Sequence, residues 1–296
     1  MTIGISVYNA AETLPLTLRS VFCQTFADWE LLLVDDGSTD ESVEIMRSVK
    51  DARVRVFVDG EHKTTAPRAN EIDLLARGSL VARMDADDIM HPDRLKKQVD
   101  YLQAHPEVDV VGTAMYSINP AQQIQGWRSI NQRPASEFAA GMRVPVIHGT
   151  VVARTAWFIR NRYDESAYAR RCEDAELWFR TYGTSVVRSL SEPLLFVTED
   201  VRNTMRKLRS SNKGRLKIMF LGKGEVRKKQ LSVRLALAAA ICLKMAFYEL
   251  CWAVGARQYL IDRRNQRLDT AQAAAAAHTL EEVLRCPVPG LDPAAR

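Results

Sequence analysis

The sequence predicts an α/β fold, with a mostly parallel central sheet and helices on both of its faces. Short runs such as residues 3–7 and 30–34 are apolar throughout, as expected of parallel strands that are covered on both faces. Segments with apolar residues at helical spacing separate these runs. Strands that alternate with helices at such lengths indicate a doubly wound sheet.

Strands and helices are expected in alternation along the first two hundred residues. The expected strands are residues 3–7, 30–34, 53–58, 80–84, 108–118, 146–152 and 184–190. The expected helices are residues 12–22, a segment ending at 46, and residues 67–76, 93–103 and 173–182. Right-handed crossovers then place the acidic ends of the second and fourth strands on one edge of the sheet.

Three local features refine this prediction. Ser38 and Glu41 have the spacing of a capping box, so Ser38 is expected to cap the helix that ends at residue 46. Asp93 is expected to contribute to the cap of the helix that follows it. Residues 122–142 are polar with weak periodicity, and we expect a loop or a short helix over the site.

Charge divides the chain into two regions. A chain of 296 residues can bury one large core or two modest ones, and its net charge is +5. Residues 1–200 carry 22 Lys and Arg against 29 Asp and Glu, whereas residues 201–296 carry 19 against 7. We therefore expect a catalytic domain at 1–200 and a basic helical region at 201–296. Within the latter, residues 272–285 predict a helix and residues 286–296 a frayed tail.

The basic region predicts contact with a membrane surface. Residues 202–229 hold eleven Lys and Arg and one acid, and an apolar segment follows from residue 231 to 261. Charged residues interrupt that segment, and a bilayer span needs about 20 mostly apolar residues, so no transmembrane helix is predicted. Each basic residue near anionic lipid contributes about 1 kcal/mol. The alternative is a solvated basic helix beside a core or dimer helix. Nucleic acid is not expected as a partner, because no recognised binding motif accompanies the charge.

The cysteines predict a reducing compartment. They are five in number, widely spaced and without a C-x-x-C pair: Cys23, Cys172, Cys242, Cys251 and Cys286. This pattern argues against a disulfide framework or a zinc site. The first strand begins almost at the first residue, which leaves no room for a signal peptide, so a cytoplasmic location is expected.

Three carboxylates, Asp85, Asp87 and Asp88, follow the apolar run at residues 80–84. Ligands of open α/β sheets bind beyond the carboxyl ends of the strands. Acids so close together raise one another's pKa unless a positive charge lies between them. A hard divalent cation, held by carboxylate oxygens and completed by phosphate oxygens, satisfies this need. The alternative is a solvated acidic turn.

Two further acidic positions have a chemical interpretation. Asp36 follows the second strand and precedes a helix, where a carboxylate can accept hydrogen bonds from a nucleoside; a turn with a cap is the alternative. No P-loop and no dinucleotide motif is present. Asp174, at the start of a helix, is a candidate base for an acceptor hydroxyl, or else a helix cap. His148 is a candidate contact of the diphosphate or the acceptor, with a structural role as the alternative.

Together these segments resemble the family 2 glycosyltransferases of the GT-A fold, especially the bacterial branch that builds capsular polysaccharide, lipopolysaccharide and exopolysaccharide. The resemblance spans about residues 3–190. The matching segments are residues 5–10, 20–26, 33–40, 82–88, 148–151 and 173–178.

The resemblance implies roles for individual residues. Ser6, Tyr8 and Asp36 match nucleotide-binding positions, and Asp36 would contact the base. Asn70 matches the asparagine of the family's donor-side helix. Asp85, Asp87 and Asp88 match the Asp-x-Asp region, in which Asp87 and Asp88 would lie nearest the Mn²⁺ or Mg²⁺ and the diphosphate. Asp174 matches the catalytic base.

The resemblance also implies an activity. The enzyme would transfer one sugar, with inversion, from a nucleotide sugar that is most often UDP-linked. The acceptor would be a glycan or a polyprenyl-diphosphate-linked sugar, reached by peripheral contact with the inner face of the cell membrane. No Gln-x-x-Arg-Trp motif follows Asp174, which argues against a processive synthase.

Two alternatives remain open. One is a sugar-phosphate nucleotidyltransferase on a similar sheet, although residues 8–12 do not form the Gly-rich phosphate loop that it would need. The other is a non-catalytic protein that binds a membrane surface through its basic region.

Overall fold

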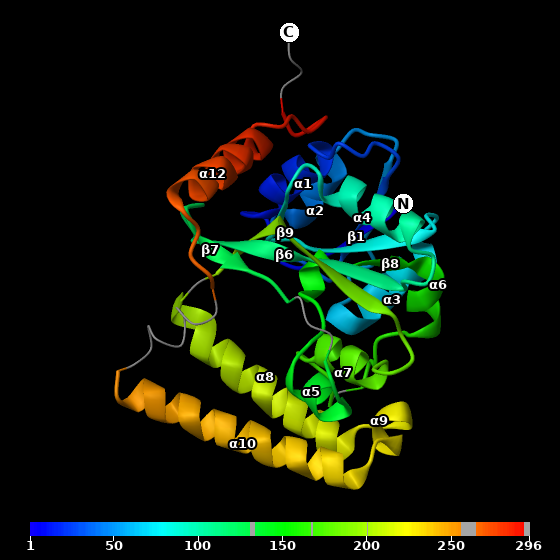
Figure 1. The fold of residues 1–296 in the computed structure, drawn as a ribbon. Helices are drawn as coiled ribbons and strands as arrows, with labels where there is room; N and C mark the ends of the chain where they lie inside the picture. The colour runs from blue at the N-terminus through cyan, green and yellow to red at the C-terminus, as the bar shows by residue number, and fades with distance from the viewer. Residues whose placement is uncertain (131–133, 167, 200, 256–264, 293–296) are drawn as a thin grey trace.

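The computed structural model describes residues 1–130, 134–166, 168–199, 201–255 and 265–292, with the backbone alone for residues 201–207. Figure 1 shows a central sheet with helices on both sides and two long helices, α8 and α10, lying beside one another below it. Three features of the predictions lie outside the described residues: the boundary at residue 200, the basic side chains at 202–207 and the end of the apolar segment at 256–261.

The described strands are β1 (Thr2–Val7), β2 (Glu30–Asp35), β3 (Val54–Phe57), β4 (Leu80–Asp85), β5 (Ile89–Met90), β6 (Val110–Ile118), β7 (Ile124–Arg128), β8 (Val152–Arg154) and β9 (Val187–Thr198). The helices of the sheet domain are α1 (Leu14–Phe22), α2 (Ser42–Ser48), α3 (Thr65–Leu75), α4 (Arg94–Ala104), α5 (Glu137–Met142), the 3₁₀ turn η1 (His148–Thr150), α6 (Thr155–Arg160) and α7 (Glu173–Arg180). The later helices are α8 (Val201–Leu221), α9 (Gly224–Lys228), α10 (Leu231–Ala253) and α12 (Thr270–Leu284).

Within the described residues these strands form one sheet in the order β3-β2-β1-β4-β8-β6-β9-β5, with β7 paired to β6. The first four strands in this order are parallel, as predicted. The other half is mixed, because β8 runs antiparallel to both β4 and β6, while β9 is parallel to β6 and antiparallel to β5. The parallel half therefore holds the strand ends that were expected to meet.

Alternate residues of the apolar strands enter two different cores. Leu31 and Leu33 of β2 pack in the core that contains α1, whereas Leu32 and Val34 pack in the core on the other face with Trp157 of α6. The four β2 side chains are at most 1% exposed. Full burial of such a side chain stabilises the fold by about 1.5–3 kcal/mol. Cover on both faces explains why the run is apolar throughout.

Gly4 allows α3 to pack directly against β1. A Cβ atom at this position would lie 2.2 Å from Cγ2 of Ile72. The close approach fixes α3 beside the ends of β1 and β2, where it carries part of the site described below.

The structure differs from the predicted elements between residues 122 and 198. The expected loop or short helix contains strand β7, a hairpin partner of β6, as well as α5. Residues 146–152 were expected to form a strand but mainly form the turn η1, since Val146 and Val151 are buried by packing rather than by a ladder. The last strand also runs on to residue 198, with Pro193 at a shift in its register with β6.

Neither predicted helix cap forms. Helix α2 begins at Ser42, and the hydroxyl of Ser38 instead accepts a hydrogen bond from the backbone N–H of Asn9 at 3.1 Å. Asp93 precedes α4 but makes no capping hydrogen bond, and its carboxylate accepts from the hydroxyl of Thr25 at 3.0 Å. Both side chains therefore tie loops that are distant in sequence.

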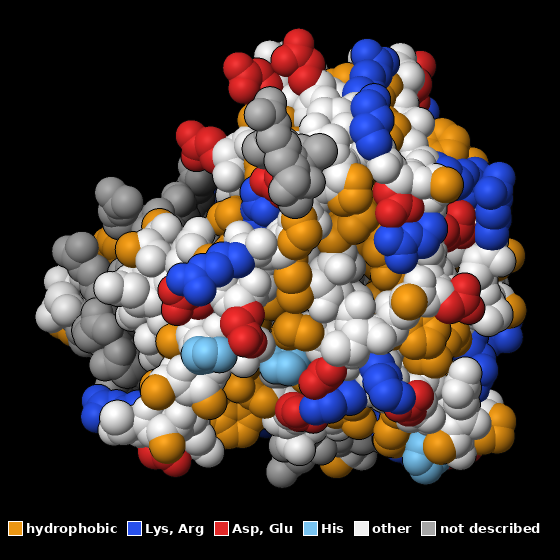
Figure 2. Space-filling model, turned by 90° about the horizontal axis from the view of Figure 1, so that it is seen from above, with side chains coloured by type: hydrophobic (Ala, Val, Ile, Leu, Met, Phe, Trp, Pro, Cys, Tyr) orange, Lys and Arg blue, Asp and Glu red, His pale blue; other side chains and the backbone are white. Residues whose placement is uncertain are grey.

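The C-terminal region divides into two parts. Helices α8 and α10 form a hairpin that packs against α5, whereas α12 returns to the sheet and packs against α1 and β7 (Figure 1). The predicted helix at 272–285 is confirmed as α12, which starts with a capping box formed by Asp269 and Gln272. Seen from above, the molecule presents a surface on which acidic, basic and apolar side chains are interspersed (Figure 2).

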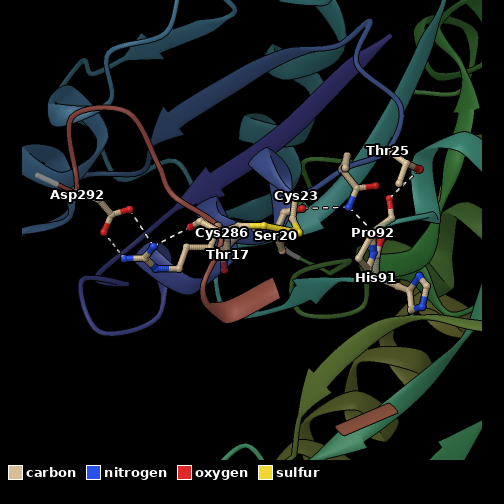
Figure 3. Close-up of a disulfide and its surroundings, with 10 residues drawn as sticks. Thr17, Ser20, Cys23, Thr25, His91, Pro92, Cys286 and Asp292 are labelled. Carbon is tan, nitrogen blue, oxygen red and sulfur yellow. Dashed lines mark hydrogen bonds and ion pairs between the residues drawn. A yellow bond between two sulfur atoms is a disulfide. The ribbon is translucent and has the colours of Figure 1, made fainter. Parts of the chain in front are cut away.

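The expectation that the cysteines form no disulfide is wrong for one pair. Cys23, after the end of α1, is bonded to Cys286, which lies 263 residues later and just beyond α12 (Figure 3). Arg19 of α1 makes a two-point ion pair with Asp292 and donates to the carbonyl of Cys286 at 2.7 Å. Val288 between them is 1% exposed, so the segment 286–292 is docked rather than frayed.

Helix α10 is long and apolar enough to cross a membrane, judged by length and composition alone. Arg234, Lys244 and Glu249 interrupt its pattern without removing this property, and the absence of a transmembrane helix stays a prediction. Only 17% of its most apolar segment is buried. Most of that apolar surface therefore lies outside the protein core.

Candidate functional site

The ends of β1, β2 and β4 bring three predicted site residues to one edge of the sheet. Ser6 of β1 is in register with Asp85 of β4 on one side and with Val34 of β2 on the other. Asp36, directly after β2, donates its backbone N–H to the carbonyl of Val7 at 2.7 Å. The acidic strand ends therefore converge, as the sequence predicts.

The carboxylate of Asp36 anchors the loop that leads into α3. It is 4% exposed and accepts hydrogen bonds from the backbone N–H groups of Lys63 at 2.7 Å and Thr64 at 3.1 Å. Nε of Arg68 also donates to it at 3.0 Å. Thr64 has a φ of 77° and a ψ of 175°, a conformation that costs about 1–3 kcal/mol outside glycine. The hydrogen bonds to Asp36 hold this strained backbone in place.

Arg68 links Asp36 to a pocket between α3 and the end of β3. It is 1% exposed, and its guanidinium also pairs with Asp59 at 2.7 Å and Glu71 at 2.8 Å. The Arg68 and Lys63 cations hold the pKa of Asp59 well below its usual range. The pocket has a volume of about 360 Å³ and is lined by Val34, Phe57, Val58, Asp59, Arg68, Glu71, Leu74 and Leu75.

Two rings lie beside this anchored loop. Tyr8, at the end of β1, is 50% exposed, and its ring centroid lies 4.4 Å from that of His62 with an interplanar angle of 35°. Nδ1 of His62 lies 3.1 Å from the Asp36 carboxylate, which fixes the imidazole. The exposed face of Tyr8 is available for a planar group to stack on.

The acidic loop after β4 is held by α1. The hydroxyls of Thr13 and Thr17 donate to the carbonyl of Ala86 at 2.9 and 3.0 Å, and Thr17 also donates to the carbonyl of Asp88 at 2.8 Å. Asp85 and Asp87 are exposed, whereas Asp88 is 4% exposed. Thr13 and Thr17 therefore fix the backbone that carries the acids.

Asp85 and Asp88 face a common point beside η1. A Cβ atom at Gly149 would lie 3.1 Å from Oδ2 of Asp88 and 3.7 Å from Oδ2 of Asp85. Glycine thus leaves this space open for a ligand. Among the residues that the structure describes, no group of three or more His, Cys, Asp or Glu side chains is arranged to hold a metal ion. Two convergent carboxylates nevertheless fit a hard cation that substrate phosphate and water complete.

A buried guanidinium lies behind these acids. Arg94 is fully buried, and its Nη2 donates to the carbonyl of Arg83 at 2.8 Å and to that of Gly149 at 2.9 Å. Burial lowers the pKa of Arg94 to about 10, and the charges of Asp88 and Asp85 oppose this shift. Arg94 therefore ties the acidic strand end to the turn η1 and offsets part of its negative charge.

His148 connects the acidic edge to α7. Its Nε2 lies 3.0 Å from the hydroxyl of Tyr163, and its ring meets Trp178 of α7 edge-on at 5.7 Å. Burial lowers the pKa of His148 to about 4; the charge of Arg83 adds to this effect and that of Asp174 opposes it. The imidazole is therefore neutral at pH 7. Its Nδ1 is buried and has no hydrogen-bond partner in the described part of the chain.

Asp174 lies in the first turn of α7 and is half-buried. Its charge acts on both His148 and Tyr163, so the three side chains form one electrostatic cluster. To the other described residues, the Asp174 carboxylate makes no hydrogen bond. A carboxylate that no neighbour occupies can accept a proton from a bound hydroxyl.

A buried chain of polar groups supports His148. Asp73 of α3 forms an ion pair with Arg83 of β4, and Nε of Arg83 donates to the hydroxyl of Tyr163 at 3.1 Å. Tyr163 is 5% exposed, and burial raises its pKa, so the phenol keeps its proton. The phenol oxygen therefore lies between Nε of Arg83, which donates to it, and Nε2 of His148.

Asn70 of α3 is held in a network of buried hydrogen bonds. It is 1% exposed, and its Nδ2 donates to the carbonyl of Tyr163 at 3.0 Å and to Glu165 at 2.8 Å. Its Oδ1 accepts from the N–H of Tyr163 at 2.9 Å. These bonds fix the loop that carries Tyr163, and the expected donor contact of Asn70 stays a prediction.

Five residues that shape the site were not among the predicted site residues: Arg68, Arg83, Arg94, Thr17 and Tyr163. Two of them have a signal in the sequence. Arg83 interrupts a strand that is apolar on both faces, and Arg94 stands with Gln98 at i and i+4 on the inward side of its helix. Charged residues at such core positions are seldom buried unless they have partners. The other three carry no comparable signal.

Comparison with known proteins identifies relatives of the chain. A family model described as glycosyl transferase family 2 matches residues 2–166. The chain is 31% identical over 205 residues to EpsE of Bacillus subtilis (strain 168), which is named as a glycosyltransferase; the match covers 68% of this chain and 73% of that protein. It is 27% identical over 130 residues to WfaP of Escherichia coli, named as a UDP-Glc:α-D-GlcNAc-diphosphoundecaprenol β-1,3-glucosyltransferase, with 40% of this chain and 52% of that protein covered.

Solved structures share the fold. The structure of S. aureus TarS 1-349 in complex with UDP has a TM-score of 0.55 at 18% identity and covers 81% of this chain and 70% of that one. The mannosyltransferase PcManGT from Pyrobaculum calidifontis, in complex with GDP-Man and Mn²⁺, has a TM-score of 0.54 at 18% identity and covers 96% and 84%. These likenesses confirm the predicted GT-A type fold.

Proposed function

The chain belongs to glycosyl transferase family 2, and from that premise we propose that it transfers one sugar from a nucleotide sugar to an acceptor hydroxyl, with inversion and with a divalent cation. The donor is UDP-linked. The acceptor is a glycan or a polyprenyl-diphosphate-linked sugar in the synthesis of a surface polysaccharide, reached at the inner face of the cell membrane. The name of WfaP, which includes both UDP-Glc and a diphosphoundecaprenol acceptor, supports these two choices.

The observation that carries the proposal is the position of Asp174. Its carboxylate makes no hydrogen bond to another described residue and lies in one cluster with the neutral His148, next to the turn that meets Asp85 and Asp88. The Asp174 carboxylate takes the proton of the acceptor hydroxyl, and the resulting oxygen attacks the anomeric carbon opposite the leaving diphosphate.

The donor nucleoside binds at the ends of β1 and β2. The base stacks on Tyr8, and the loop fixed by Asp36, His62 and Arg68 supplies polar contacts. Ser6 lies next to Asp85 in register, between the nucleoside and the diphosphate. The UDP bound to TarS, which has the same fold, supports a uridine donor.

Asp85 and Asp88 would hold a Mn²⁺ or Mg²⁺ ion, with the exposed Asp87 beside them. Such an ion neutralises charge on the diphosphate leaving group. The Mn²⁺ in the PcManGT complex supports this assignment. Thr17 fixes the backbone of Asp88, and Arg94 fixes the backbone of Arg83 and Gly149 beside these carboxylates.

The proposal is tested by following products. We expect the chain, given Mn²⁺, UDP-sugars and a GlcNAc-diphosphoundecaprenol acceptor, to release UDP and to form a β-linked product from an α-linked donor, as read by NMR. A chelator should stop the reaction and restored Mn²⁺ should resume it. Release of pyrophosphate instead of UDP would indicate a nucleotidyltransferase. Binding of nucleotide without turnover of any donor would indicate a non-catalytic protein.

A further inference from the structure

Helix α10 presents a continuous apolar stripe to solvent. Leu231, Leu235, Leu243, Phe247 and Leu250 are each about half exposed or more, and Leu243 reaches 73%. Ala239 and Ala246, also exposed, fill the intervals at helical spacing. A helix of 23 residues is about 34 Å long, so the stripe runs the length of a small domain. Apolar patches of this extent mark an interaction surface.

The opposite face of α10 is packed against protein along its length. Leu237 and Ile241 are buried, and a Cβ atom at Gly141 of α5 would lie 2.5 Å from Leu237. Nε of Arg234 donates to the carbonyl of Met219 in α8 at 2.7 Å. A helix that crossed a bilayer in this arrangement would carry the charges of α8 into the hydrocarbon, at high cost. The geometry therefore favours a helix that lies on a bilayer over one that spans it.

A row of basic residues borders the apolar stripe. Arg209, Lys213 and Lys217 of α8 follow one another at intervals of four and are all exposed. Arg209 pairs with Glu249, which lies at the edge of the stripe on α10, so the basic row and the stripe share one side of the hairpin. Exposed Lys223, Arg227 and Lys228 continue the basic row to the start of α10.

We propose that the α8–α10 hairpin docks on the surface of an anionic bilayer, with α10 in the plane of the interface and the basic row on the lipid headgroups. The charge favours lipid over a second copy of the chain, because anionic headgroups complement this border whereas a second copy would add more positive charge. Helix α10 packs on α5, and α5 packs on α7, which carries Asp174. Docking thus places the proposed base one helix layer from the membrane. The benefit of such docking is access to a lipid-linked acceptor, and in this respect the inference rests on the proposed function.

The test is co-sedimentation with vesicles of phosphatidylcholine, with and without phosphatidylglycerol. We expect the wild-type chain to bind only the anionic vesicles, and more weakly as salt increases. The double variant Leu243→Asp/Phe247→Asp should lose at least about tenfold in affinity, because two side chains leave the apolar phase. Lys213→Glu/Lys217→Glu should also weaken binding. Ile159→Asp on α6, where the native side chain is 43% exposed, is the matched control and should bind as wild type.

Transfer to a soluble acceptor analogue separates this inference from the proposed function. The hairpin variants should keep the wild-type rate with that acceptor while they lose vesicle binding. Equal vesicle binding by wild type and the Leu243→Asp/Phe247→Asp variant would overturn docking. Docking would also be overturned if the wild-type chain formed a dimer that does not bind vesicles, and if the same substitutions converted this dimer to monomers. Resistance of the wild-type chain to alkaline extraction from vesicles would overturn the in-plane orientation.

Discussion

The hydroxyl of Tyr163 lies 3.0 Å from Nε2 of His148 and is also the acceptor for Nε of Arg83 at 3.1 Å. This contact joins a buried ion pair to the histidine nearest the proposed base. Because both partners of the phenol are buried, its removal leaves two polar groups unpaired. Tyr163 is thus a positioning residue for His148.

Tyr163→Phe should destabilise the protein by about 1–3 kcal/mol, the cost of unpaired buried groups, and lower kcat with little change in UDP affinity. Chemical denaturation, steady-state kinetics and UDP titration measure the three effects. Tyr182→Phe is the control, since its half-buried hydroxyl donates to the carbonyl of Pro134, at 3.3 Å, and not to a site residue. If the folded Tyr163→Phe enzyme kept the wild-type kcat, Tyr163 would not position His148 for the reaction.

The neutral state of His148 predicts a loss of stability in acid. Its folded pKa of about 4 lies below the ordinary value of 6.5, so between these values the unfolded chain binds the additional proton. Stability from this group is complete above pH 6.5 and declines as pH falls toward 4, by on the order of 2–3 kcal/mol. Urea unfolding across this range should show a smaller decline for His148→Gln. Parallel curves for the two proteins would contradict the assignment.

The hydroxyl of Thr17 should control the affinity for the cation. Thr17→Val keeps the shape of the side chain but removes the hydrogen bonds to Ala86 and Asp88, which loosens the acidic loop. We expect Mn²⁺-dependent activity to need a higher Mn²⁺ concentration, by about tenfold for a loss of 1.4 kcal/mol. Thr25→Val, which loses a hydrogen bond to Asp93, is the control. An unchanged Mn²⁺ dependence would show that α1 does not support the site.

The bond between Cys23 and Cys286 should make stability depend on redox conditions. Because the bond closes a loop of more than 250 residues, the oxidised protein should gain about 2–4 kcal/mol over the reduced one. Urea unfolding with and without dithiothreitol measures this difference. The Cys23→Ser/Cys286→Ser variant should be insensitive to the reductant and resemble the reduced wild type, which retains the Arg19–Asp292 ion pair. In a reducing cytoplasm both cysteines would be thiols.

The parallel half of the fold could be predicted from the sequence because its information is local. An acidic residue directly follows the apolar run of an expected strand, as at residues 30–34. Parallel strands bring their carboxyl ends to one edge of the sheet, whatever the conformation of the loops. The mixed half could not be predicted in the same way. Strand β7 has weak periodicity of its own and forms as the hairpin partner of β6. The turn η1 depends on burial of Val146 among residues that are distant in sequence.

The site shows the same division. The positions of Asp36, Asp85 and Asp174 at the ends of strands or the start of a helix could be predicted from the local pattern, and their roles stay predictions. The long-range contacts could not be predicted. Thr17 bonds the backbone of Asp88, Tyr163 contacts His148, and Cys23 is bonded to Cys286, and each contact joins segments that are far apart in sequence. The hydrogen bonds of Asn70 to the loop that carries Tyr163 also join distant segments and could not be predicted.

The account depends most on Asp174 as the base, and transfer by the Asp174→Asn enzyme tests it most directly. Glu173→Gln, the neighbouring acid in the same helical turn, is the matched control. We predict that Asp174→Asn lowers kcat by at least about 10²-fold, as expected when a general base is lost, while UDP-sugar binding and the Glu173→Gln enzyme stay near wild type. Transfer by Asp174→Asn at the wild-type rate would contradict the account.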